Sequence, residues 1–286
     1  MKPQISELSP ERLYDYRARM TQMPATRDSL HQDMTALGIA EGDGVFVHAS
    51  LGAIGPVVGG ARAVIEALQD CVGPGGLIGM PAFSQDARWP DLIDREACTE
   101  DQRRAIQNAV PAHDPRLSHC LGMGLIADTF RQWPGTVRSD HPNVSVCLNG
   151  AEAQRFVAPH SAAWATGADT PLGSLARRAN MKVLLIGVDW TRCSPLHTAE
   201  FYAKPRRTKI RRFKTGAGQA PWHEVPDVAD DLGRIFPATG EAFEATGLVT
   251  FGDIGQAGCR LCPYDQLLTF ATRFIGSANA ESGDRH

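Results

Sequence analysis

The sequence has no long apolar run, and its first twenty residues lack the pattern of a signal peptide. No window reaches the roughly 18 continuous apolar residues that a membrane span requires. The opening stretch, MKPQISELSPERLYDYRARM, is polar and charged where a secretory signal would be apolar. We therefore expect a cytoplasmic protein that has no membrane partner.

Cysteine is too scattered to build a disulfide framework. The seven cysteines are an odd number spread over 286 residues, which indicates reduced thiols. Cys259 and Cys262 form a C-x-x-C pair, but no second cysteine pair or closely spaced histidine pair completes a zinc site. We expect two buried thiols beside a C-terminal helix and no metal ion, although the sequence leaves zinc binding at this pair open.

An excess of positive charge is also missing. The chain has 29 Lys and Arg residues against 32 Asp and Glu residues, a formal net charge of −3. Because nucleic-acid binders usually carry a basic face, a nucleic-acid partner is not expected. The small net charge neither supports nor excludes a cationic small molecule as substrate.

Apolar and helical segments alternate along the chain, which is typical of an α/β fold. Strands are predicted over residues 44–50, 77–83 and 182–188, the last of which reads as a strongly buried strand. Between the first two, residues 61–72 have an amphipathic helical pattern. Its apolar face consists of Ala61, Val64, Ile65, Leu68 and Val72.

The chain has no internal repeat and no low-complexity linker, so we predict one domain over residues 1–275. Residues 276–286 are expected to form a disordered tail. Residues 84–117 are polar and irregular, and a loop of that length can serve as a lid or a substrate wall. Residues 206–215 and 219–225 are predicted to pair as a hairpin.

The stretch VLLIGVDWTRCSPLHTAEFYAK places a histidine in the first turn of a predicted helix. Ser194 is a good N-cap and Pro195 suits the first helical position, so His197 occupies the third. The helix dipole disfavours a proton on the ring, whereas Glu200, one turn on, favours it or selects the ring nitrogen that carries it. His197 is therefore either a general base at the carboxyl end of a sheet or a histidine that only caps the helix.

A glycine-rich loop, HASLGAIGPVVGGARAV, connects the first predicted strand to the helix over 61–72. It lacks the Gly-Lys-Ser/Thr of a P-loop, and Gly52, Gly55, Gly59 and Gly60 do not fit the dinucleotide pattern G-x-G-x-x-G. Backbone amides in such a loop can hold a pyrophosphate or a pantetheine arm. Glycines at these positions can equally serve a tight connection that needs positive φ.

A third polar cluster, RSDHPNVSV, contains a guanidinium and an imidazole. Arg138 can donate to a phosphate or a carboxylate. His141 precedes Pro142, which favours an extended or turn conformation. Taken alone, this pattern is more typical of a polar loop than of a site.

Together these motifs resemble the antibiotic N-acetyltransferase family, the aminoglycoside 3-N-acetyltransferases. The motifs that carry the resemblance are, in order, VHASLGAIGPVVGG, GPGGLIGMP, RSDHP, TPLGSLARRANMKVLLIGV and SPLHTAE. Their order and spacing match over roughly residues 30–275. Two positions depart from the family pattern: Ala49 replaces a serine, and Ser194 stands where the family usually has threonine.

The resemblance implies direct transfer of an acetyl group from acetyl-CoA to the 3-amino group of the 2-deoxystreptamine ring of aminoglycoside antibiotics, in a ternary complex. It implies a central mixed sheet flanked by helices, distinct from the GNAT fold. His197 would be the general base, Glu200 its partner, and the Ser194 hydroxyl a group that stabilises the oxyanion. The acidic residue expected after the hairpin is Asp227, Asp230 or Asp231, among which the sequence does not choose.

The same resemblance suggests which residues contact acetyl-CoA, the expected co-substrate. The loop at 50–60 would hold the pyrophosphate and the pantetheine arm, and Arg138 would meet phosphates. The residues assigned to this role are His48, Ser50, Leu51, Gly52, Gly55, Val57, Arg138, Ser139 and His141. Asp86, Asp91 and Asp94 in the long loop could add to a wall that attracts a cationic acceptor.

Several alternatives remain open. The acceptor could be a non-aminoglycoside amine of a biosynthetic pathway, because the motifs speak mainly for the acetyl donor. His48, His141 and His197 could belong to a metal-dependent hydrolase, although no H-x-H or H-E-x-x-H spacing supports it. A non-catalytic CoA-binding module and an acetyl-enzyme on Cys193 are further alternatives. The sequence does not distinguish a monomer from a homodimer.

Overall fold

A mixed sheet forms the centre of the computed structural model, which describes residues 23–84, 86–90, 93–120, 122–214, 221–229 and 233–283. Within these ranges seven strands pair in the order β3-β4-β2-β1-β5-β9-β8. The strands are β1 (Gly44–Ala49), β2 (Leu77–Pro81), β3 (Val137–Arg138), β4 (Val146–Gly150), β5 (Met181–Ile186), β8 (Thr250–Ile254) and β9 (Ala257–Pro263). The predicted α/β fold with a central mixed sheet is confirmed.

The three central strands are parallel, and the outer pairs are antiparallel. β1 pairs in parallel with β2 and with β5, whereas β4 and β9 run antiparallel to their neighbours. Parallel strands covered on both faces read as continuous apolar runs, which is why the sequence indicates β5 so clearly. Val183, Leu184, Leu185 and Ile186 of this strand are all fully buried.

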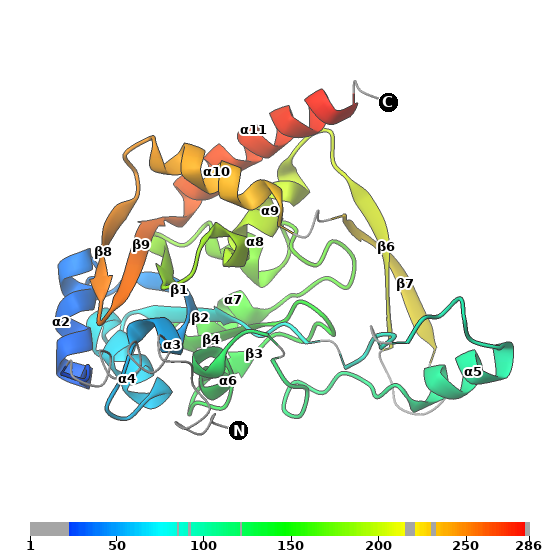
Figure 1. Ribbon diagram of the computed structural model, residues 1–286, viewed down its shortest axis with the longest axis horizontal. Helices are drawn as coiled ribbons and strands as arrows, with labels where there is room; N and C mark the ends of the chain where they lie inside the picture. The colour runs from blue at the N-terminus through cyan, green and yellow to red at the C-terminus, as the bar shows by residue number, and fades with distance from the viewer. Residues whose placement is uncertain are drawn as a thin grey trace, which may run out of the picture.

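Helices cover both faces of the sheet (Figure 1). One face packs against α2 (Arg27–Leu37), α4 (Ala61–Val72) and α6 (Leu125–Arg131). All five residues of the apolar face predicted for α4 are buried. The opposite face packs against α7 (Ala153–Val157), α8 (Pro171–Leu175), α9 (Pro195–Tyr202), α10 (Ile235–Glu244) and α11 (Tyr264–Gly283).

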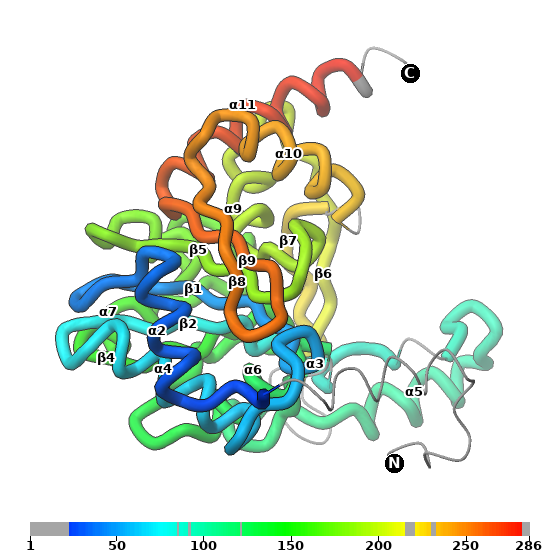
Figure 2. Tube along the Cα trace, turned by 60° about the vertical axis from the view of Figure 1, so that its left-hand side comes forward, coloured from blue at the N-terminus to red at the C-terminus, as the bar shows by residue number. Residues whose placement is uncertain are grey.

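The predicted hairpin is present as a separate two-stranded sheet. β6 (Thr208–Lys214) pairs antiparallel with β7 (Trp222–Val228), in a register that runs from Thr208 opposite Val228 to Lys214 opposite Trp222. Figures 1 and 2 show this hairpin beside the main sheet, with α5 (Glu100–Ala109) beyond it. The long loop predicted as irregular therefore contains a helix. Its missed signal is the capping box of Thr99 and Gln102, whose side chains each accept a backbone N–H of the other.

The prediction of a disordered tail from residue 276 is wrong over 276–283, because α11 continues to Gly283. Tertiary contacts hold this end of the helix. A Cβ on Gly276 would lie 3.2 Å from the Lys204 carbonyl oxygen, and Asn279 Nδ2 donates to the Pro205 carbonyl over 2.9 Å. The sequence also predicts no element over 235–256, where the structure has α10 and β8. No helix in the described ranges is long and apolar enough to cross a membrane.

Lys214 of the hairpin binds the long loop in two places, at Ala87 and at the carboxyl end of α5. The side chain is fully buried, and its Nζ donates to the carbonyl oxygens of Gln107, Asn108 and Val110. Its backbone N–H donates to the Ala87 carbonyl over 2.8 Å. Three acceptors match the three donors of an ammonium group, so the buried charge is satisfied at the carboxyl end of α5.

We expect Lys214→Met to loosen α5 while leaving the central sheet folded. The substitution removes three charge-assisted hydrogen bonds and leaves the carbonyl of buried Val110 unsatisfied, a local cost of about 1–3 kcal/mol. Hydrogen exchange measured by mass spectrometry should speed up over residues 100–110. The control is Lys204→Met, because Lys204 is exposed. Unchanged protection of α5 in the Lys214 variant would show that the contact does not hold the helix.

Candidate active site

The parallel strands end at one edge of the sheet, and the three segments that follow them meet there. β1 leads into α3 (Leu51–Ile54), β2 leads into Phe83 and Ser84, and β5 leads through the 3-10 turn η2 (Trp190–Arg192) into α9. Ligand sites of open α/β sheets lie at this carboxyl edge. The predicted position of His197 at the carboxyl end of a sheet is confirmed.

Two cavities open at this edge, and we call them the large cleft and the small pocket. The large cleft has a volume of about 970 Å³ and runs between the loop at 48–55, the segment 122–127 and the turn before α9. The small pocket has a volume of about 280 Å³ and lies between Asn143, Arg211, Asp227 and Phe236. The two cavities share the residues Phe83, Met123, Thr191 and His197.

His197 is held by three contacts and lines both cavities. Its Nδ1 lies 2.7 Å from Oε2 of Glu200, which is buried, and its ring packs edge-on against Phe236 with centroids 4.9 Å apart. Thr166 Oγ1 donates to the His197 carbonyl over 3.1 Å. With Nδ1–H donating to the carboxylate, Nε2 of a neutral ring keeps its lone pair. An oriented imidazole backed by a carboxylate is able to act as a general base.

Ser194 and His48 line the large cleft together with His197. Ser194 occupies the N-cap position of α9, but its side chain makes no capping hydrogen bond, so the predicted capping role is wrong. The residue has helical dihedral angles, φ −57° and ψ −30°, which turn the hydroxyl away from the N2 and N3 amides. Its backbone N–H instead donates to His48 Nε2 over 3.3 Å. Burial, and secondarily the charge of His197, lower the pKa of His48 to about 3.

The glycine-rich loop contributes most of its predicted residues to the large cleft. His48, Ser50, Leu51, Gly52 and Gly55 line it. Gly55 has a φ of +88°, and a Cβ there would lie 2.6 Å from the Gln256 side chain, so this position requires glycine. Val57 is not among the lining residues, because its strand-like bridge with Ala25 turns this part of the loop toward α2.

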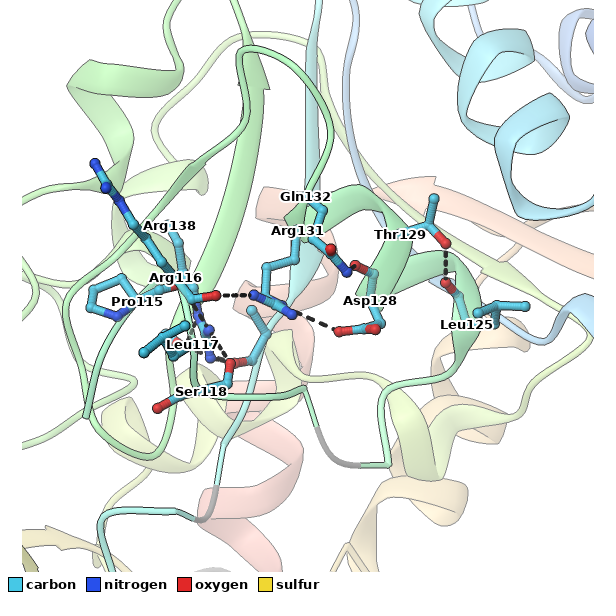
Figure 3. A network of polar contacts seen from close by, with 12 residues as sticks. Pro115, Arg116, Leu117, Ser118, Leu125, Asp128, Thr129, Arg131, Gln132 and Arg138 are labelled. Carbon is cyan, nitrogen blue, oxygen red and sulfur yellow. Dashed lines mark hydrogen bonds and ion pairs between the residues drawn. The ribbon is translucent and has the colours of Figure 1, made fainter. Parts of the chain in front are cut away.

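The Arg138, Ser139 and His141 cluster lines neither cavity, and its contact with the cofactor stays a prediction. The Arg138 guanidinium donates to the carbonyl oxygens of Ala82, Pro115 and Ser118 and to Ser145 Oγ. Figure 3 shows Arg138 and Arg131 directed at the carbonyls of 115–118. The physical reason is that the guanidinium satisfies loop carbonyls that no strand would otherwise pair.

The two other members of this motif are buried deeper. His141 is 0% exposed, and its Nδ1 accepts the backbone N–H groups of Asn143 and Val144. Ser139, 2% exposed, lies 2.8 Å from Nδ1 of His160. Burial is the main cause that lowers the pKa of His141 to about 3 and that of His160 to about 4. These histidines are neutral members of a structural network.

Asp227 lines the small pocket, but its carboxylate is already paired. The residue is 1% exposed and accepts the Ala165 and Val228 backbone N–H groups through Oδ1. Its Oδ2 accepts from Nε of Arg211, which faces the same pocket. Asp230, Asp231 and Asp91 lie outside the described residues. Asp86 and Asp94 line neither cavity.

The cysteines singled out by the sequence are buried thiols. Cys193 is 0% exposed, and burial raises its pKa well above the ordinary value. Cys259 packs among side chains on one face of the sheet, while Cys262 packs on the other. Side chains three positions apart along a strand point to opposite faces of the sheet, so these two thiols cannot share one metal ion in this conformation. In the described ranges no group of three or more His, Cys, Asp or Glu side chains is arranged to hold a metal ion.

Sequence reasoning missed several residues that form the small pocket. Asn143, Thr166, Arg211 and Phe236 come from four separate segments, and each lies far along the chain from most of the others. Only Asn143 carries a local signal, because it follows His141 and Pro142 in the RSDHPNVSV stretch. The others are brought together by the packing of β6, β7 and α10 near α9.

Comparison with known proteins identifies similar chains along most of the sequence. The family model described as aminoglycoside 3-N-acetyltransferase matches residues 46–275. The SPbeta prophage-derived aminoglycoside N(3')-acetyltransferase-like protein YokD of Bacillus subtilis (strain 168) is 34% identical over 261 residues, covering 89% of this chain and 94% of the relative. These matches span all the motifs at the carboxyl edge of the sheet.

Two solved structures with bound ligands share the fold. AAC-IIIb in binary complex with CoASH is 30% identical, with a TM-score of 0.80 over 90% of this chain and 98% of that chain. AAC-VIa bound to sisomicin is 27% identical, with a TM-score of 0.76 over 90% of this chain and 99% of that chain.

The buried histidines predict a loss of stability in mild acid. The pKa values of His48, His141 and His160 lie near 3, 3 and 4 in the folded protein, below about 6.5 for an unfolded chain. Because the unfolded chain binds more protons between these values, the contribution is fully present above pH 6.5 and is lost as the pH falls toward 3. The free energy of unfolding should fall by up to about 4 kcal/mol per pH unit in this window.

Urea unfolding at pH 7, 6 and 5 measures this dependence. His141→Gln should reduce the slope of the unfolding free energy against pH by the equivalent of about one proton. His119→Gln, at an exposed position, should leave this slope unchanged. A flat profile from pH 7 to pH 5 in the unsubstituted protein would contradict the neutral, buried state of these rings.

Proposed function

Because the chain belongs to the aminoglycoside 3-N-acetyltransferase family, we propose that it transfers an acetyl group from acetyl-CoA to the 3-amino group of the 2-deoxystreptamine ring of an aminoglycoside. The observation that carries this proposal is the position of His197, which lines the large cleft and the small pocket at once. A two-substrate reaction needs one base at the point where two sites meet. An enzyme with this activity would confer antibiotic resistance.

The large cleft suits acetyl-CoA in size and lining. A volume of about 970 Å³ is at the upper end of the range for small-molecule sites, as a long, extended ligand requires. Its walls combine apolar side chains such as Leu51, Met80 and Met123 with the backbone of Gly52 and Gly55. A Cβ added to Gly52 would meet nothing within 4 Å, so a ligand can approach the backbone there. When bound, acetyl-CoA supplies an activated thioester.

His197 acts as the general base in this proposal. Its Nε2 removes a proton from the neutral acceptor amine as the carbon–nitrogen bond forms and the carbonyl oxygen becomes an oxyanion. When the oxyanion collapses, the carbon–sulfur bond breaks and Nε2 returns that proton to the departing sulfur. Glu200 keeps Nδ1–H in place and stabilises the imidazolium between these steps. Base catalysis of this kind typically contributes about a hundred- to ten-thousand-fold. No covalent intermediate on the protein is required.

Ser194 is the candidate for stabilising the oxyanion. The residue lines the large cleft next to His197, and its hydroxyl is not used for capping. His48 Nε2 accepts a hydrogen bond from the Ser194 backbone N–H, which fixes this turn against the end of β1. The serine therefore takes the place of the usual family threonine without losing the hydroxyl.

A non-aminoglycoside amine remains a second candidate acceptor, and one observation favours it. Aminoglycosides are polycationic, so acidic side chains free to meet them are expected. Asp227, the carboxylate described in the small pocket, is instead neutralised by Arg211 and two backbone N–H groups. This pairing suits an acceptor that has fewer positive charges near the reacting amine.

Release of free thiol from acetyl-CoA across a panel of aminoglycosides tests the proposal. We expect His197→Ala to abolish turnover while acetyl-CoA binding, measured by calorimetry, stays unchanged. Glu200→Gln keeps an acceptor for Nδ1–H but loses the charge, so kcat should fall about 10- to 100-fold at unchanged KM for acetyl-CoA.

Each negative result has a distinct meaning. Turnover that persists in His197→Ala would remove the base assignment. Binding of acetyl-CoA without turnover on any aminoglycoside would support the second candidate acceptor and move the search to other amines. Absence of acetyl-CoA binding in the unsubstituted protein would overturn the proposal as a whole.

Cys193→Ala should retain turnover within about twofold, because the thiol is buried outside the large cleft and its raised pKa disfavours the thiolate nucleophile. Mass spectrometry of the protein mixed with acetyl-CoA alone should detect no acetylated cysteine. An acetylated Cys193 that forms and then decays on addition of acceptor would establish a covalent route instead.

A further inference from the structure

The small pocket contains a buried carboxamide that the proposed chemistry does not use. Asn143 is 5% exposed and lines the pocket, yet neither Nδ2 nor Oδ1 meets a hydrogen-bonding partner in the described part of the chain. Buried polar side chains are nearly always hydrogen-bonded, because leaving a donor or acceptor unpaired is costly. A carboxamide whose nitrogen and oxygen are both unpaired in the wall of a cavity points to a ligand that forms hydrogen bonds with these two atoms.

The backbone of Asn143 holds this side chain in place. Its N–H donates to His141 Nδ1 over 3.1 Å, and its carbonyl accepts the Ser84 N–H over 3.2 Å. Ser84 Oγ donates to the neighbouring Pro142 carbonyl over 2.7 Å. The buried His141 network therefore fixes the segment that presents the carboxamide, so the group is pre-organised for binding.

The pocket has room for one substituted ring. Its volume of about 280 Å³ corresponds to about nine water molecules in the liquid, below the usual range for a drug-sized ligand. His197 shares this pocket with Asn143, so the ring in it would carry the amine that is acetylated. Beyond Asn143, Arg211 also lines this pocket, and its Nε donates to Asp227.

We propose that Asn143 selects the acceptor ring by hydrogen-bonding polar substituents near the reacting amine. Nδ2 donates to a ring hydroxyl or ether oxygen, and Oδ1 accepts from a second hydroxyl or amine. A simple alkyl or aryl amine, which lacks these polar substituents, is therefore a poor substrate. This inference rests on the proposed acetyl transfer and names the group that Asn143 recognises.

Asn143→Leu, which has a similar shape and no polar atoms, tests this assignment. With an aminocyclitol acceptor, kcat/KM should fall about 10- to 100-fold, while KM for acetyl-CoA stays within twofold. The matched control is Thr198→Val, because the Thr198 hydroxyl is also buried and unpaired but lines neither cavity. That variant should keep the activity of the unsubstituted enzyme.

A panel of acceptors that each lack one ring hydroxyl or amine gives the sharper readout. The analogue that lacks the group bound by Asn143 should be a poor substrate for the unsubstituted enzyme. Its kcat/KM should be the same for the unsubstituted enzyme and for Asn143→Leu, because the contact is absent in both. A merely structural role would reduce kcat/KM for all analogues by the same factor in the variant, and that result would overturn the assignment.

Two further measurements keep the outcomes separate. Thermal unfolding shows whether Asn143→Leu is folded, and Asn143→Ala, which cannot clash, replaces it if it is not. If the unsubstituted enzyme acetylates an aminocyclitol and both variants match it, only this inference fails. If it acetylates alkyl amines as fast as aminocyclitols, the inference also fails while acetyl transfer stands. If it acetylates no amine at all, the proposed function fails first.

Discussion

Parallel pairing of β1 with β2 and β5 is the constraint on which the rest of the structure depends. Three buried strands that run in one direction must end at one edge, so the segments after Ala49, Pro81 and Ile186 meet there. The glycine-rich loop, the wall at Phe83 and the turn into α9 thereby surround the same space. The helices on both faces bury the strands and hold this edge fixed.

Two kinds of polar residues follow from this arrangement, and they differ in what they contact. Arg138, Ser139 and His141 bond to carbonyls, hydroxyls and backbone N–H groups of segments that the sheet leaves unpaired. His197 and Asn143 are themselves held by such bonds but keep a ring nitrogen or a carboxamide at a cavity wall. A charged or aromatic residue in a motif is therefore not by itself a ligand-binding residue. Its polar atoms can instead be used to form the hydrogen bonds that buried backbone groups require.

Charge distribution around the meeting point of the two cavities bears on the acceptor. The large cleft is lined mainly by apolar side chains and glycine-rich backbone, whereas the small pocket combines Asp227, Arg211 and a neutral carboxamide. The Asp227 carboxylate has three partners within the protein. In the proposed reaction, recognition on this side would depend on directed hydrogen bonds to one ring more than on attraction between opposite charges, which would also limit its sensitivity to salt.

The sequence by itself determined the features that depend on neighbouring residues. Buried β5, the apolar face of α4, the hairpin of β6 and β7, and the pairing of His197 with Glu200 three residues on all follow from strand or helix periodicity. Only the tertiary structure decided which polar groups reach a cavity. Arg138 turned inward, α11 continued along Lys204 and Pro205, and Asn143 came to line one pocket with Arg211 and His197. The physical reason is that these contacts join residues distant in the chain, whose distances are set by sheet register and helix packing and not by local spacing.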